Sequence, residues 1–110
     1  MAAVKTLDER KQARAEEICD GVARLRHQLA DYGRTHGGRF WLYGSAVTGQ
    51  IRYDSDVDVL VDFDPSRMAD AFDFLETACE RLRLKLDARP KAGCTPSFID
   101  RIAPKALVLP

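Results

Sequence analysis

The stretch GSAVTGQIRYDSDVDVLVDF, residues 44–63, decides the fold. Its second half, DVDVLVDF, alternates from Asp56 to Phe63, so that successive side chains point to opposite faces of an expected strand. One face carries Val57, Val59, Val61 and Phe63, and the other carries Asp56, Asp58, Leu60 and Asp62. We therefore expect a strand with one face in the core and one acidic face.

Helices are predicted on both sides of this strand. Apolar side chains recur every three or four positions over residues 7–32 and again over 68–82, which predicts two amphipathic helices. The first should end at the glycines that follow it, Gly33, Gly37 and Gly38. A shorter helix is expected over 96–102, because a threonine and a proline suit its start.

Three further segments are expected to be extended. Residues 40–43 form an aromatic and aliphatic run that ends at a glycine, which is typical of a buried strand breaking into a turn. A third strand is expected over 84–87, closed off by Arg89 and Pro90, and a final strand or extended tail over 106–109. Together the elements predict an α+β fold, a two-layer arrangement in which helices cover a small mixed sheet.

Size and composition limit the organisation of the chain. With 110 residues and 45% hydrophobic content it can build one core, so we expect a single domain over 1–110, with a helical segment at 1–37 and a core at 38–110. Seventeen basic and seventeen acidic residues cancel, so any anionic ligand must be held locally. The sequence contains no apolar run of about 20 residues, and we expect a cytoplasmic protein that does not enter a membrane.

The cysteines give no sign of a disulfide framework or a zinc site. Cys19, Cys79 and Cys94 are an odd number and form no CxxC pair. Cys19 and Cys79 fall on predicted apolar helical faces, so we expect both to be buried as small hydrophobic side chains.

Asp56 and Asp58 are the first candidates for chemistry. Two positions apart on a strand, their side chains should share a face and repel each other. A divalent cation would reverse that repulsion, because magnesium takes carboxylate oxygens together with phosphate oxygens. Taken alone, the pair could equally be the solvent-facing side of an ordinary strand.

Gly44 and Ser45 strengthen the case for a site. They follow an expected buried strand, where glycine permits close backbone approach and serine adds a hydroxyl group, and such a turn can hold phosphates. A glycine and serine pair is common in ordinary turns, so the combination carries the argument: Gly44 and Ser45, ten residues, Asp56, one residue, Asp58.

This combination resembles the signature of the DNA polymerase β-like nucleotidyltransferase superfamily, most closely its minimal, single-domain branch. The resemblance implies the nucleotidyltransferase fold, with Gly44 and Ser45 on the phosphates of a nucleotide and Asp56 and Asp58 on the metal. It extends to the strand LKLD, where Asp87 falls at the place of the third carboxylate and would share a second metal ion. The alternative for Asp87 is a polar residue that simply closes a short strand.

The sequence departs from the family pattern after the glycine and serine. The segment Ala46, Val47, Thr48 lacks an arginine that many minimal nucleotidyltransferases carry there. Arg52 stands where the family often has a basic residue and could replace that phosphate contact, although a solvated loop arginine is as good an interpretation. Ser55 is expected to order the loop before Asp56.

The resemblance implies transfer of a nucleoside monophosphate, AMP from ATP with Mg²⁺ or Mn²⁺, to a hydroxyl group. Minimal nucleotidyltransferases often accompany a helical HEPN-domain toxin, which they adenylylate and silence, so we expect a HEPN-type partner and an antitoxin role. Two alternatives stay open: a nucleotide-binding antitoxin that acts by contact without turnover, and transfer to RNA or a small molecule together with another subunit.

Overall fold

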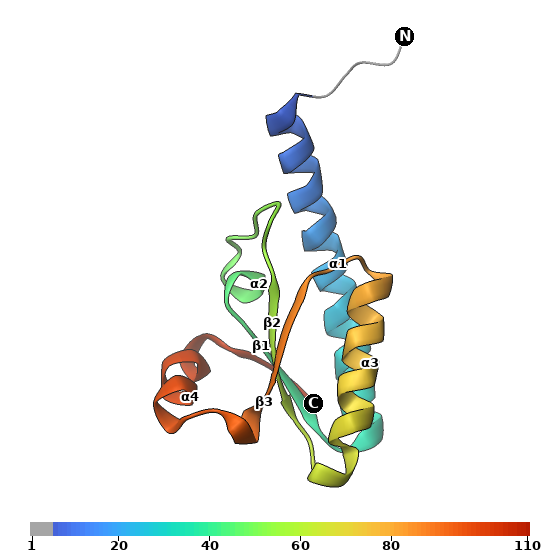
Figure 1. Ribbon diagram of the computed structural model, residues 1–110, viewed down its shortest axis with the longest axis vertical. Coiled ribbons are helices and arrows are strands. Elements are labelled where there is room, and N and C mark those ends of the chain that lie inside the picture. Colours follow the sequence, from blue (N-terminus) through green and yellow to red (C-terminus); the bar gives the residue numbers. More distant parts are fainter. Residues whose placement is uncertain (1–5) are drawn as a thin grey trace.

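The chain folds into one four-stranded sheet with two helices against one face (Figure 1). The computed structural model describes residues 6–110, so residues 1–5 of the expected domain lie outside the described part. The main elements are α1 (Leu7–His36), β1 (Arg39–Tyr43), α2 (Ser45–Thr48), β2 (Val57–Asp62), α3 (Met68–Arg81), β3 (Leu86–Pro90), α4 (Pro96–Ile102) and β4 (Leu107–Leu109). Single 3-10 turns, η1 (Pro65–Arg67), η2 (Lys91–Gly93) and η3 (Ala103–Lys105), join some of them. The expected α+β fold is confirmed.

The sheet is mixed and has the strand order β3-β2-β1-β4. β1 is antiparallel to both of its neighbours, whereas β2 and β3 are parallel and are connected through α3. The long connection is a requirement of parallel pairing, because a tight turn can join only antiparallel strands. As a result the start of β2 and the start of β3 lie at the same end of the sheet.

The main core lies between the sheet and the helices α1 and α3. Alternate strand positions supply it, as the valines of β2 and Phe40 and Leu42 of β1 are all at most 1% exposed. The core face of β2 is therefore confirmed.

The opposite face is only partly the acidic surface that we expected, because Leu60 is fully buried there. The segment from η2 to α4 covers this part of the sheet: the ring of Phe98 meets Tyr43 edge-on at 5.7 Å between centroids. The ammonium of Lys91 lies 5.2 Å from the centre of the Trp41 ring, and Trp41 is the partner of Leu60 in the strand register.

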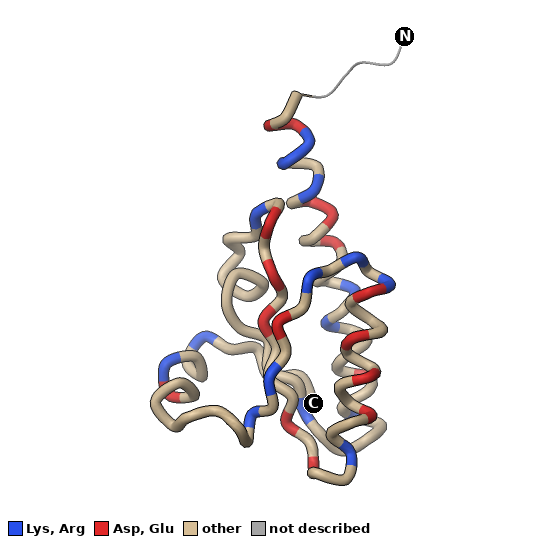
Figure 2. Tube along the Cα trace, viewed as in Figure 1, with Lys and Arg blue, Asp and Glu red and all other residues tan. Residues whose placement is uncertain are grey.

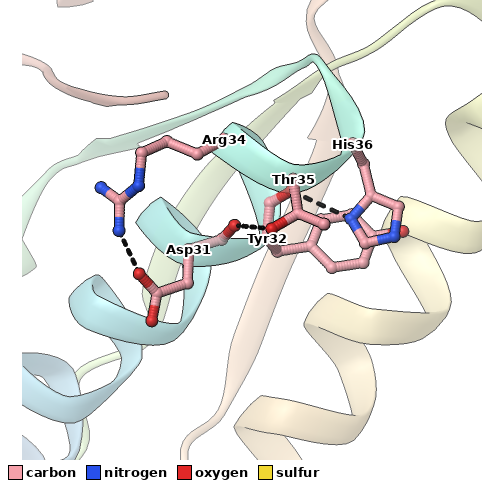
Figure 3. Close-up of polar contacts among 5 residues, drawn as sticks. All are labelled: Asp31, Tyr32, Arg34, Thr35 and His36. Atoms are coloured by element: carbon pink, nitrogen blue, oxygen red, sulfur yellow. Dashed lines mark hydrogen bonds and ion pairs between the residues drawn. The ribbon is translucent and has the colours of Figure 1, made fainter.

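The first helix is longer than its glycines predicted. Gly33 lies inside α1, and the helix ends at Gly37, whose φ of 71° is the left-handed conformation that glycine adopts without strain. Figure 3 shows the last turns: Thr35 donates to the Asp31 carbonyl at 2.8 Å, and the His36 ring nitrogen Nδ1 lies 3.0 Å from the Tyr32 carbonyl. The Tyr32 ring stacks on His36 at 3.9 Å and on Phe74 of α3 at 4.3 Å.

Two more expectations need correction. The third strand runs over Leu86–Pro90 rather than 84–87, so Arg89 and Pro90 belong to it. Pro90 is tolerated because β3 is an edge strand and the position of the missing N–H faces away from β2. Cys79 is buried, which raises the pKa of its thiol to about 11, but Cys19 is exposed because it lies beside rather than within the buried stripe of α1.

The described helices include none with the length and apolarity needed to cross a membrane. The expected helix over 96–102 and the final strand are confirmed.

Candidate functional site

The turn after β1 and the start of β2 meet in one close contact. Gly44 has φ 73° and ψ −149°, a conformation that is open essentially only to glycine. A Cβ atom on Gly44 would stand 2.4 Å from Oδ2 of Asp58, well inside contact distance. The absence of a side chain at Gly44 therefore makes room for the Asp58 carboxylate. The turn that opens the stretch 44–63 and the strand that follows in it are in contact here.

A second carboxylate faces Asp58 from the neighbouring strand. Asp58 of β2 and Asp87 of β3 are direct partners in the parallel register, so their side chains lie on the same face of the sheet. Burial is the largest cause that raises the pKa of the Asp58 carboxyl, followed by the negative charges of Asp87 and Asp56, while Arg89 lowers it. The start of β2 is thus a place of concentrated negative charge, visible as the acidic positions where β2 begins and β3 passes beside it in Figure 2.

Asp56 is less closely held than the sequence suggested. β2 begins at Val57, so Asp56 lies in the preceding loop and is exposed, although its charge still acts on Asp58. Among residues 6–110, no three acidic, histidine or cysteine side chains converge tightly enough to form a complete metal site. The pair of hard oxygen donors at Asp58 and Asp87 nevertheless fits magnesium, which proteins commonly hold through one or two carboxylates with substrate phosphates as the remaining ligands.

The turn that was predicted to hold phosphates, and the loop after it, are short, ordered segments. Ser45 is half-buried and begins the four-residue helix α2, and Gly49 closes it by donating to the Ser45 carbonyl at 3.2 Å. Ser55 accepts the Arg52 backbone N–H at 2.7 Å, so it orders the loop as expected. The Arg52 side chain is exposed and forms no ion pair within the described residues.

Arg89 is a neighbour of the carboxylates that the sequence analysis did not identify as part of the site. Its Nε lies 3.7 Å from Oδ1 of Asp87, and its guanidinium lies 5.6 Å from the centre of the Phe98 ring. Tyr43 is a second such residue: burial, and then the charge of Asp58, raises the pKa of its hydroxyl. Arg89 could have been found from the sequence: if β3 had been predicted to its full length, alternation would have put Arg89 on the same face as Asp87.

The surface grooves do not all coincide with this site. A groove of about 680 Å³ lies between α1 and α3, lined by Tyr32 and Phe74 among others, and includes none of the predicted site residues. A second, of about 540 Å³, lies between α3 and β3 and includes Asp87. The predicted residues Gly44, Asp58 and Asp87 are therefore brought together, Asp56 adjoins them, and Arg52 is not seen in contact with them.

Comparison with known proteins shows the class to which this chain belongs. The sequence profile of the nucleotidyltransferase domain matches residues 22–107, and the chain belongs to this family. A solved structure described as a candidate minimal nucleotidyltransferase has the same fold, with a TM-score of 0.65, 24% sequence identity, and coverage of 81% of this chain and 93% of the other. No curated protein is significantly similar to the sequence. Members of the family generally use a nucleoside triphosphate and a divalent metal ion.

Proposed function

We propose that this chain transfers AMP from ATP to a hydroxyl group of a macromolecule, with Mg²⁺ or Mn²⁺ held at Asp56, Asp58 and Asp87. The observation that supports it best is the contact of Asp58 with Gly44, because this contact places a half-buried carboxylate directly against the turn proposed to hold phosphates. An ordinary surface strand does not require an aspartate side chain packed against a glycine whose conformation is open essentially only to glycine.

The residues of the chain have separate tasks in this proposal. Gly44 and Ser45 hold the phosphates, and Arg52 or Arg89 supplies positive charge for them. Asp56 and Asp58 would hold the metal ion, which when bound would supply positive charge to the triphosphate. Asp87 shares that task and accepts the proton of the attacking hydroxyl group.

The proposed step is an in-line displacement. The acceptor oxygen forms a bond to the α-phosphorus, and the bond from that phosphorus to the oxygen bridging to the β-phosphate breaks. Pyrophosphate leaves, the hydroxyl proton passes to Asp87, and the acceptor retains AMP as a phosphodiester. No redox change is involved.

The acceptor proposed is a HEPN-type partner protein, which the modification would silence, so that the chain would act as an antitoxin. This proposal rests on the resemblance to minimal nucleotidyltransferases. A hydroxyl group on a partner protein would be positioned by contacts between the two protein surfaces.

Intact-mass spectrometry of a co-expressed HEPN-domain partner tests the function. With ATP and magnesium the partner should gain the mass of one AMP unit per modified site, and the gain should vanish with Asp58→Asn or Asp87→Asn. Asp64→Asn, on an exposed loop after β2, is the control that should leave the gain intact. Neutralisation of the partner by an inactive variant without any mass change would instead support the antitoxin that acts by contact.

A further inference from the structure

β3 is an edge strand with free backbone groups on its outer side. It stands at the end of the sheet order, and no strand pairs with its outer edge within the described residues. The N–H of Val57 donates to the Lys85 carbonyl at 2.8 Å, so residues 85, 87 and 89 turn their backbone groups toward β2. Leu86 and Ala88 therefore direct their N–H and C=O groups outward, and Pro90 ends the run because it has no N–H.

A groove accompanies this free edge. It has a volume of about 540 Å³, and its lining includes Phe72, Leu86 and Ala88 as apolar surface and Glu76 and Glu80 of α3 as acidic surface. Both glutamates are exposed, and neither forms an ion pair among residues 6–110. An exposed strand edge beside a groove that can take alternate side chains is the arrangement that proteins use to bind an extended peptide as an additional strand.

The position of Asp87 connects this edge with the proposed transfer reaction. Asp87 lies between the two outward-facing residues, Leu86 and Ala88, and shares its face of the sheet with Asp58. On a strand added to β3, the residue opposite Asp87 points its side chain to that same face. A hydroxyl group at this position would be presented directly to the carboxylate pair.

The neighbours of that residue would also face acidic side chains, on the other side of the sheet. Side chains alternate along a strand, so the residues immediately before and after the hydroxyl-bearing one point to the α3 side, where Glu76 and Glu80 line the groove. The free edge of β4 is a poorer candidate, because it is three residues long and is separated from β2 by β1.

We infer that the acceptor of the proposed transfer is an extended protein segment that adds to the edge of β3, with its hydroxyl residue opposite Asp87 and flanked on both sides by lysine or arginine. The inference rests on the proposed function for the identity of the reaction, but the docking itself requires only the edge, the groove and the two glutamates.

Docking is measured without turnover by NMR hydrogen exchange on the full-length chain. The probe is a short capped peptide with a central tyrosine, a lysine on each side and β-branched residues beyond them. It should slow exchange at the Leu86 and Ala88 amides and leave the amides of β4 unchanged. The same peptide with glutamates in place of the lysines, or with N-methylated backbone amides, should give no protection. Protection at β4 instead, or equal protection by the glutamate peptide, would overturn the inference.

A charge reversal on α3 tests the two glutamates. Glu76→Lys with Glu80→Lys should weaken binding of the lysine peptide about three- to tenfold, as expected for two partly exposed charge pairs, and should improve binding of the glutamate peptide. Asp73→Lys is the control, with effects compared per reversed charge, because Asp73 is an exposed acid on the same helix but lines the groove between α1 and α3. An equal effect of Asp73→Lys would show that net charge alone is responsible and would refute the site.

The transfer reaction separates the two proposals. With ATP and magnesium, the lysine peptide should gain AMP faster than the glutamate peptide, and a peptide with phenylalanine in place of tyrosine should gain none. If the chain binds a nonhydrolysable ATP analogue with magnesium but protects no β3 amide, the docking inference fails while the proposed function stands. If the peptide docks at β3 but neither nucleotide binding nor AMP transfer occurs, the proposed function fails.

Discussion

The Asp58 carboxylate occupies the space that a side chain on Gly44 would need, since a Cβ there would lie 2.4 Å from its Oδ2. The atom that it would meet is the end of a side chain and can swing away. A side chain at Gly44 should therefore displace the carboxylate as well as strain the turn.

We predict that Gly44→Ala reduces metal-dependent nucleotide binding far more than its effect on stability would suggest. The backbone strain should cost roughly 1–3 kcal/mol of unfolding free energy. Gly49→Ala is the matched control: Gly49 also has a positive φ, 80°, but nothing lies within 4 Å of its Cβ position. Calorimetry with an ATP analogue should show binding retained by Gly49→Ala and lost by Gly44→Ala; similar losses would show that strain alone is responsible.

Asp58→Asn should stabilise the metal-free protein at neutral pH. Burial and the charges of Asp87 and Asp56 raise the pKa of Asp58, so the folded state holds this proton more tightly than the unfolded chain does. Ionisation of Asp58 therefore opposes folding as pH rises above about 4, the usual aspartate pKa. Thermal unfolding in a chelator should show a higher Tm for Asp58→Asn near pH 7, with the advantage disappearing near pH 3. The exposed Asp64→Asn should show no such gain, and a wild type that is the more stable at neutral pH would contradict the assignment.

Ser45→Ala should lower kcat/KM by the equivalent of about 1–3 kcal/mol, which is the cost of losing a hydrogen bond to a charged group. The measurement is AMP transfer at limiting ATP. Thr48→Ala, at the exposed end of the same short helix, removes a hydroxyl group that the proposal does not use. Equal turnover in both variants would leave Ser45 as a turn residue only.

Gly33→Ala should destabilise the fold although alanine favours helices. A Cβ at Gly33 would come within 1.7 Å of the Pro110 carbonyl oxygen, so the end of the chain after β4 would have to move. At Gly21 of the same helix the nearest atom is a terminal carbon of Leu84 at 3.0 Å, which can shift. Denaturant unfolding should place Gly33→Ala about 1–3 kcal/mol below Gly21→Ala. The reverse order would show that β4 is held only loosely against α1.

The sequence was most informative where neighbouring positions determine the structure. The spacing from Gly44 to Asp58 predicted a turn and a strand, and the structure brings these two residues together through one antiparallel strand pair. The alternation in β2 likewise predicted which valines are buried. Both are short-range patterns, in which neighbouring positions determine the outcome.

Long-range packing explains what the sequence did not predict. Leu60 is buried because α4, nearly forty residues later, returns to the sheet through Phe98 and Tyr43. Gly33 lies inside α1, where Pro110 packs against it, and β3 continues to Pro90 with a partner in β2 at each of its positions. None of these contacts leaves a mark in the local periodicity of the segments involved.

The continuous connection from β2 through α3 to β3 also bears on the order of folding. Asp58 and Asp87 belong to neighbouring strands of one unbroken segment, whereas β1 finds β4 only across most of the chain. Contacts between segments close in sequence cost less loop-closure entropy and tend to form first. The carboxylate pair should therefore assemble before the sheet is complete, and a cation that bridges it would speed folding of this segment by relieving the repulsion between the two charges.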